Sequence, residues 1–119
     1  MMDEMKRKLL LEAGIDVDEA LGRFLGNEAL MMKFLLRFPE DQNFSRLRQS
    51  VAQGDAAGAF EAAHTLKGVA GNLSMGTLFR QISAQVEDLR AGNVAAAADK
   101  MPALEETYSR TLAALQQLV

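Results

Sequence analysis

Apolar residues recur at intervals of three and four positions along most of this 119-residue chain. That spacing places side chains on one face of an α-helix. No segment shows a sustained two-residue alternation with β-branched content, which is the corresponding pattern of a half-buried strand. Internal repeats of about 20–50 residues are absent as well. The sequence therefore predicts an all-α fold.

Capping signals divide the first part of this pattern into short helices. A helix is predicted over residues 2–13, with Gly14 positioned to end it. Asp16 and Glu19 form a predicted capping box, in which the Asp16 carboxylate accepts the N–H of Glu19 and the Glu19 side chain reaches back to the Asp16 backbone. The helix that follows is expected to end near Gly26. Its predicted buried residues are Val17, Leu21, Phe24 and Leu25.

Asn27 is a candidate cap for the next helix, which has a wide apolar face. Pro39 disfavours helical geometry at the residue before it, so we expect a break there. Helical periodicity resumes at Phe44 and stops near Gly54. The predicted apolar face before the break comprises Leu30, Met31, Phe34, Leu35 and Phe38.

Asp55 is expected to cap a central helix over residues 56–73, and Ser74 to cap the helix after it. Gly92-Asn93 separates that helix from the last part of the chain, where Pro102 suits the first turn of a new helix. The predicted packing residues are Met75, Leu78, Ile82, Val86 and Leu89, then Leu104, Tyr108, Leu112, Leu115 and Leu118. Short connections favour antiparallel neighbours, so we predict an up-down four-helix bundle core with additional short N-terminal helices packed on it.

The central helix carries the only histidine of the chain. Its core-facing stripe is Ala59, Ala63, Leu66, Ala70 and Leu73. His64 points about 140° away from this stripe on a helical wheel, which predicts a surface position. Lys67, Gly68 and Gly71 fall on the same exposed face. A glycine inside a helix costs about 1 kcal/mol relative to alanine, and here two of them leave the imidazole uncovered. Gly68 and Gly71 are therefore expected to belong to the partner-binding surface and to let a partner protein approach His64.

An uncovered imidazole with one ammonium nearby suits the transfer of a phosphoryl group. The neutral ring is a nucleophile near neutral pH, because its ordinary pKa is about 6.5. Lys67, at i+3 from His64, is expected to balance the charge of the phosphorylated ring. Phe60 and Glu61 occupy the preceding turn and are candidates for binding a partner, with Phe60 as the docking anchor.

The run from His64 to Gly68, with Ala62-Ala63 before it and Gly71-Asn72-Leu73 after it, resembles the signature of histidine-containing phosphotransfer (HPt) domains. The likeness extends from Ile15 to the C-terminus. The chain departs from the family pattern at Ser74, just after the motif, where the family often has glycine. This difference affects the expected shape of the turn at Ser74.

The resemblance implies a four-helix bundle with His64 outward and phosphorylated on Nε2. It also implies a phosphorelay intermediate that accepts phosphoryl from a receiver-domain aspartyl phosphate and passes it to another receiver aspartate. The implied partners are response-regulator receiver domains, a hybrid sensor histidine kinase, or both. Mg²⁺ is expected on the receiver, and we expect no cofactor bound to this chain itself.

Length and composition predict one domain over residues 1–119. The resemblance divides it into an N-terminal helical extension over residues 1–14 and an HPt-like region over residues 15–119. The net charge is −3, and acidic and basic residues are interspersed along the chain. The sequence therefore provides no broad positive field that would bind nucleic acid. No apolar run approaches the roughly 20 residues that span a bilayer, so we expect a cytoplasmic protein without a membrane partner. We also expect a monomer, because the functional face must stay free.

Two other functions remain as alternatives. The first is a degenerate docking module that binds receivers through the same face without carrying phosphate. The second is an enzyme with His64 as general base, which requires a pocket and a second polar group that the sequence does not show. A metal site is not expected, because the chain has one histidine and no cysteine. No nucleotide-binding loop is visible, so we predict a phosphocarrier without kinase activity of its own.

Overall fold

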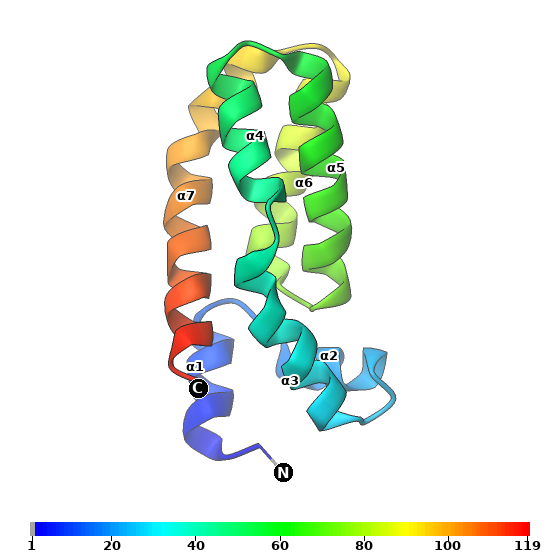
Figure 1. Cartoon of the computed structure of the whole chain (residues 1–119), viewed down its shortest axis with the longest axis vertical. Coiled ribbons are helices and arrows are strands. Elements are labelled where there is room, and N and C mark those ends of the chain that lie inside the picture. Colours follow the sequence, from blue (N-terminus) through cyan, green and yellow to red (C-terminus); the bar gives the residue numbers. More distant parts are fainter. Residues whose placement is uncertain (1) are drawn as a thin grey trace.

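Four helices of 10 to 23 residues form an antiparallel bundle, and three helices of 7 to 10 residues lie at one end of it (Figure 1). The computed structural model describes residues 2–119; Met1, part of the predicted extension over residues 1–14, lies outside them. The short helices are α1 (Glu4–Glu12), α2 (Val17–Arg23) and α3 (Glu28–Arg37), and the bundle comprises α4 (Asn43–Ala52), α5 (Ala56–Asn72), α6 (Gly76–Arg90) and α7 (Val94–Gln116). The described residues contain no strand, only an isolated bridge between Ile15 and Met75. The predicted all-α bundle is confirmed.

Side-chain caps fix the start of most helices. In each case an Asp or Asn oxygen accepts the backbone N–H of the residue three positions later, which satisfies one of the free donors of the first turn. The predicted caps Asp16, Asn27 and Asp55 do so at 3.1, 3.0 and 3.0 Å. Asp3 and Asn93 cap α1 and α7 in the same way. Local sequence therefore determines where these helices begin.

The break predicted at Pro39 is present. Helix α3 ends at Arg37, and a 3₁₀ turn, η1 (Phe38–Glu40), leads to α4. Helix α1 likewise ends before Gly14, as predicted. Gly14 has φ +87°, and a Cβ there would lie 2.5 Å from Oγ1 of Thr77, so both conformation and space require glycine.

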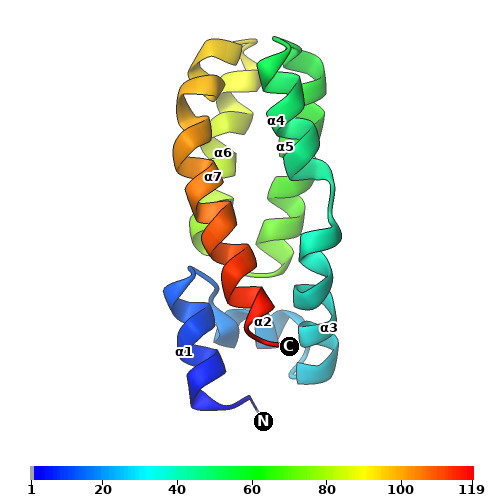
Figure 2. The same ribbon diagram turned by 60° about the vertical axis from the view of Figure 1, so that its left-hand side comes forward.

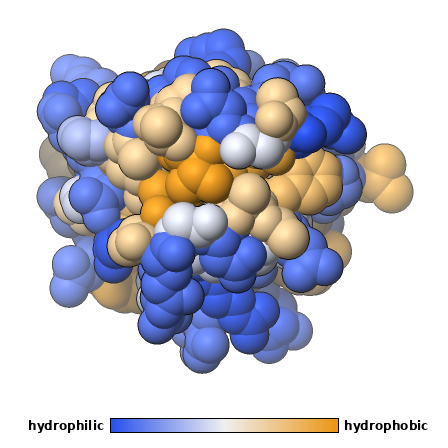
Figure 3. Space-filling view, turned by 90° about the horizontal axis from the view of Figure 1, so that it is seen from above, coloured by the Kyte–Doolittle hydropathy of each residue, from blue (hydrophilic) through white to orange (hydrophobic). Residues whose placement is uncertain are grey.

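The core lies between the four bundle helices α4 to α7, with α5 packed against both α4 and α6. The predicted stripe of α5 is buried throughout, and its alanines let the neighbouring helices approach closely. The predicted packing residues of α6 are buried as well. At the end of the bundle where the α4–α5 and α6–α7 connections lie, an apolar centre is ringed by hydrophilic side chains (Figure 3). The core therefore extends along the whole length of the bundle.

The short helices are held by the last helix of the bundle. Helix α7 contacts α1 and α3 in addition to α4 and α6, and Figure 2 shows the C-terminus at the end of the bundle where the short helices lie. Leu10 of α1 and Leu118 after α7 are both buried. The N-terminal helices thus share one hydrophobic core with the bundle.

The prediction that a new helix begins at Pro102 is wrong. Helix α7 runs without interruption from Val94 to Gln116 and contains Pro102. A proline inside a helix removes one backbone hydrogen bond. Tertiary contacts offset this loss, because Ala97 and Met101 are buried and Gln85 of α6 donates from Nε2 to the Ala97 carbonyl at 2.9 Å.

Three residues predicted to be buried in the N-terminal region are exposed. Leu25 is 95% exposed with φ +55°, because the chain turns after Arg23 and Gly26 N–H bonds back to the Leu21 carbonyl at 2.8 Å. Leu30 and Phe34 are 39% and 43% exposed. Helix α3 is covered along one side only, where its buried residues are Met31 and Leu35, followed by Phe38.

Ser74 does not cap α6, so this prediction is also wrong. Its φ is +54°, in the left-handed region that favours glycine, and the turn therefore keeps the shape that a glycine would give it. The buried Ser74 hydroxyl donates to Oε1 of Glu19 at 2.9 Å, and the Asp16 N–H donates to the Ser74 carbonyl at 2.9 Å. Glu19 therefore does not reach back to Asp16, and only half of the predicted capping box forms.

Tyr108 provides a pH test of the packing. Its ring stacks on Phe44 with centroids 3.8 Å apart, and burial is the main cause that raises the pKa of its hydroxyl, followed by the Asp41 carboxylate. The folded protein holds this proton to higher pH than the unfolded chain. The free energy of unfolding should therefore be unaffected by Tyr108 below pH about 10 and fall as the pH rises through the folded pKa.

Phenolate absorbance measures this directly, because Tyr108 is the only tyrosine and the chain has no tryptophan. The native midpoint should lie above the midpoint in concentrated urea. Equal midpoints would contradict the proposed burial effect.

Candidate functional site

His64 lies near the middle of the 17-residue helix α5 and is exposed. Its neighbours Ala63 and Leu66 face the core, and the helix continues without a break through Gly68. Within residues 2–119, neither ring nitrogen of His64 has a hydrogen bond or an ion pair. The predicted exposure on an uninterrupted helix is confirmed, and both nitrogens are available to an incoming group.

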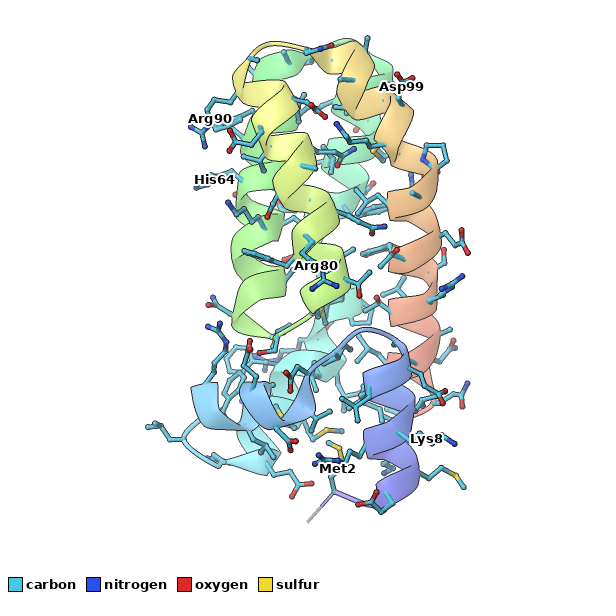
Figure 4. The ribbon with its side chains drawn as sticks, turned by 180° about the vertical axis from the view of Figure 1, so that it is seen from behind. Met2, Lys8, His64, Arg80, Arg90 and Asp99 are labelled. Carbon is cyan, nitrogen blue, oxygen red and sulfur yellow. The ribbon has the colours of Figure 1, made fainter. Side chains whose placement is uncertain are left out.

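An aromatic ring lies beside the imidazole, and a cation lies over that aromatic ring. The rings of Phe60 and His64 are stacked, with centroids 5.7 Å apart and an interplanar angle of 29°. Cζ of Arg90 lies 5.2 Å from the Phe60 ring centroid. Figure 4 shows Arg90 and His64 projecting on the same side of the molecule, from α6 and α5. Sequence analysis did not single out Arg90, because it reaches the site through the packing of α6 on α5.

Lys67 lies one turn beyond His64 and is half-buried. Its Nζ lies 5.7 Å from the centroid of the Phe79 ring, a cation–π geometry. It forms no ion pair within the described part of the chain. The charge of Lys67 is therefore not already neutralised by a carboxylate.

The two glycines near His64 have different surroundings. Gly68 is exposed, and a Cβ there would have no heavy atom within 4 Å. A Cβ on Gly71 would lie 3.2 Å from Cε2 of Phe79. A glycine at this position is therefore explained by the close packing of Phe79 inside the protein. The sequence assigned both to partner access, and the surroundings fit that role for Gly68 alone.

His64 borders two open hollows. One, of about 520 Å³, includes Arg46, Phe60 and Glu61 in its lining. The other, of about 420 Å³, includes Lys67, Gly68 and Phe79. A larger hollow of about 850 Å³ between α2, α3 and the end of α5 does not include His64. An imidazole at the edge of shallow hollows suits contact with another macromolecule better than enclosure of a small substrate.

A family model described as the Hpt domain matches residues 31–117, which is most of the chain. The chain belongs to the Hpt domain family. No curated protein and no solved structure matched it. Hpt domains act in phosphotransfer in two-component phosphorelays, where they interact with receiver domains and kinases, and they are phosphocarriers rather than kinases.

The matched segment of this Hpt domain contains the main residues of the site. His64, Lys67 and Gly68 all lie within the matched segment. The match begins inside α3, so α1 and α2 precede it, whereas the likeness seen in the sequence begins at Ile15. The N-terminal helices are therefore an addition to the part that the family model covers.

Among residues 2–119, no group of three or more His, Cys, Asp or Glu side chains is placed to hold a metal ion. None of the described helices is both long enough and apolar enough to cross a lipid bilayer. What the site presents is one exposed imidazole, the Lys67 ammonium one turn further along the helix and the uncovered Gly68.

Proposed function

We propose that this Hpt domain is a phosphorelay intermediate in which His64 accepts a phosphoryl group from a receiver aspartyl phosphate and passes it to another receiver. The observation that carries this proposal is an exposed imidazole with no hydrogen bond or ion pair within residues 2–119, near the uncovered Gly68, in a chain of the Hpt family. Geometry and family membership support the same role for His64.

The transfer is a displacement at phosphorus. The lone pair of Nε2 attacks, a P–N bond forms, and the P–O bond to the receiver aspartate breaks. The aspartate leaves as a carboxylate on the receiver, and the ring then releases its Nδ1 proton to solvent. In the second step the carboxylate of another receiver attacks phosphorus, the P–N bond breaks, and the ring regains a proton.

The receiver would supply most of the electrostatic catalysis. Its acidic residues would hold Mg²⁺, which neutralises charge on the transferred group. This chain would contribute the nucleophile, the Lys67 charge and a docking surface that includes Glu61 and Gly68. We therefore expect it to need no cofactor of its own.

The cytoplasmic location and the monomeric state predicted from the sequence stay predictions. The same holds for the single domain over residues 1–119 and for the absence of nucleic-acid and membrane partners. The choice between a receiver and a hybrid sensor histidine kinase as phosphodonor is also part of the proposal.

Lys67→Ala should slow transfer about tenfold or shorten the lifetime of the phosphorylated histidine by a similar factor. A charge-assisted contact of roughly 1.5 kcal/mol corresponds to such a factor. Rapid-quench measurement of the transfer rate and of phosphohistidine decay would test this. Lys67→Arg retains the charge and serves as the control. Wild-type values for both quantities in Lys67→Ala would remove the role assigned to this residue.

Incubation with a ³²P-labelled receiver domain and Mg²⁺ tests the proposed function. The wild-type chain should acquire a label that is lost in acid and kept in alkali, as expected for a P–N bond. A receiver that binds tightly without transferring label would instead support the docking module. If the wild-type chain neither binds nor takes up label from any receiver in a panel, the proposal is overturned.

A further inference from the structure

We propose that Phe60 is a positioning residue, which holds the imidazole of His64 in one orientation for attack on phosphorus. This inference rests on the proposed function, and it assigns to Phe60 a role other than the docking anchor expected from the sequence. The observation behind it is the stacking of the two rings, with centroids 5.7 Å apart.

The orientation of His64 needs an external restraint. The ring is exposed and has no hydrogen-bond partner within residues 2–119, so nothing polar fixes its side-chain torsions. Transfer requires the nitrogen lone pair to lie in line with the bond that breaks, and a misplaced reacting atom slows the reaction strongly. Aromatic rings with centroids about 4.5–7 Å apart attract each other beyond simple burial, and Phe60 lies in this range.

Phe60 is itself held in place. It is half-buried against the hydrophobic core, and the guanidinium of Arg90 lies over its ring at 5.2 Å. Nε of Arg90 also lies 3.6 Å from Oε2 of Glu87 on the same helix. A series of contacts therefore runs from Glu87 through Arg90 and Phe60 to His64, and it links α6 to the reacting ring.

Two substitutions separate positioning from docking. Phe60→Leu keeps an apolar side chain of moderate size but removes the aromatic face, whereas Phe60→Tyr keeps that face. Positioning predicts that Phe60→Leu lowers the maximal transfer rate about three- to tenfold with an unchanged KM for the receiver, and that Phe60→Tyr retains the wild-type rate. Phe34→Leu, at a half-exposed phenylalanine on α3, is the matched control and should keep the wild-type maximal rate.

Proton NMR reports on the ring directly, because His64 is the only histidine. Its imidazole signals should move in Phe60→Leu, where the ring current of Phe60 is lost, and stay near their wild-type positions in Phe60→Tyr. Circular dichroism of each variant checks that the helices are intact.

The outcomes distinguish this inference from the proposed function. A wild-type chain that takes up no label overturns the function, while unchanged imidazole signals in Phe60→Leu overturn the stacking. A labelled wild type together with an undiminished maximal rate in Phe60→Leu overturns positioning. A raised KM at an undiminished maximal rate overturns it too, and assigns Phe60 to docking instead.

Discussion

His64→Gln is expected to take up no phosphoryl group from a labelled receiver, which corresponds to a loss of more than about a thousandfold. Glutamine offers no ring nitrogen with a free lone pair, because the lone pair of an amide nitrogen is delocalised into its carbonyl. The substitution should leave the fold intact. His64 is exposed and has no hydrogen bond or ion pair in the described chain, and such surface changes usually alter the free energy of unfolding by less than about 0.5 kcal/mol.

Three measurements on His64→Gln make this result specific. Thermal unfolding should match the wild type, the receiver should still bind, and the acid-labile label should be absent. Acid-labile label on this variant would mean that another side chain accepts the phosphoryl group, and the assignment of His64 would fail.

Gly68→Gln is expected to reduce transfer by about a hundredfold while making the protein more stable. Glycine inside a helix is less favourable than glutamine or alanine by up to about 1 kcal/mol, and a Cβ at Gly68 would touch nothing within 4 Å. The long side chain would occupy the surface one turn beyond His64, where a receiver must bring the phosphorus of its aspartyl phosphate to within about 3.5 Å of the ring nitrogen.

Two control substitutions separate this effect from helix stability. Gly22→Gln, at an exposed glycine of α2 with nothing within 4 Å, should stabilise the protein and leave transfer unchanged. Gly71→Ala should be neutral or destabilising, because its Cβ would lie 3.2 Å from Phe79. A wild-type transfer rate in Gly68→Gln would show that glycine is not there to admit the receiver.

Features of the fold that depend on local sequence were predictable. The caps Asp16, Asn27 and Asp55 act within one helical turn, and the break at Pro39 follows from the backbone N–H that proline lacks. The stripe of α5 follows from helical periodicity alone. In each case the cause lies within a few residues along the chain.

Features that depend on contacts between distant segments were not predictable. Pro102 lies inside a helix because Ala97 is buried and its carbonyl is bonded by Gln85 of a neighbouring helix. Ser74 adopts a glycine-like conformation in a turn where its hydroxyl bonds to Glu19, 55 residues away. No local pattern indicates either interaction.

The same division applies to the site. His64, Lys67 and Gly68 share one face of one helix, so their spacing sufficed to bring them together. Arg90 comes from α6, and the packing reason for Gly71 is an aromatic ring of that helix. A single sequence shows the nucleophile but not the neighbours that tertiary packing brings to it.

An imidazole without a neighbour on its outer side also lacks a shield against water. A phosphoryl group carried there would meet bulk solvent whenever no receiver covers it, and its survival would depend on the P–N bond and on whatever charge Lys67 supplies. No part of residues 2–119 covers the exposed ring. How long a signal persists would then be set by how often receivers encounter the carrier, and so by their abundance in the cell.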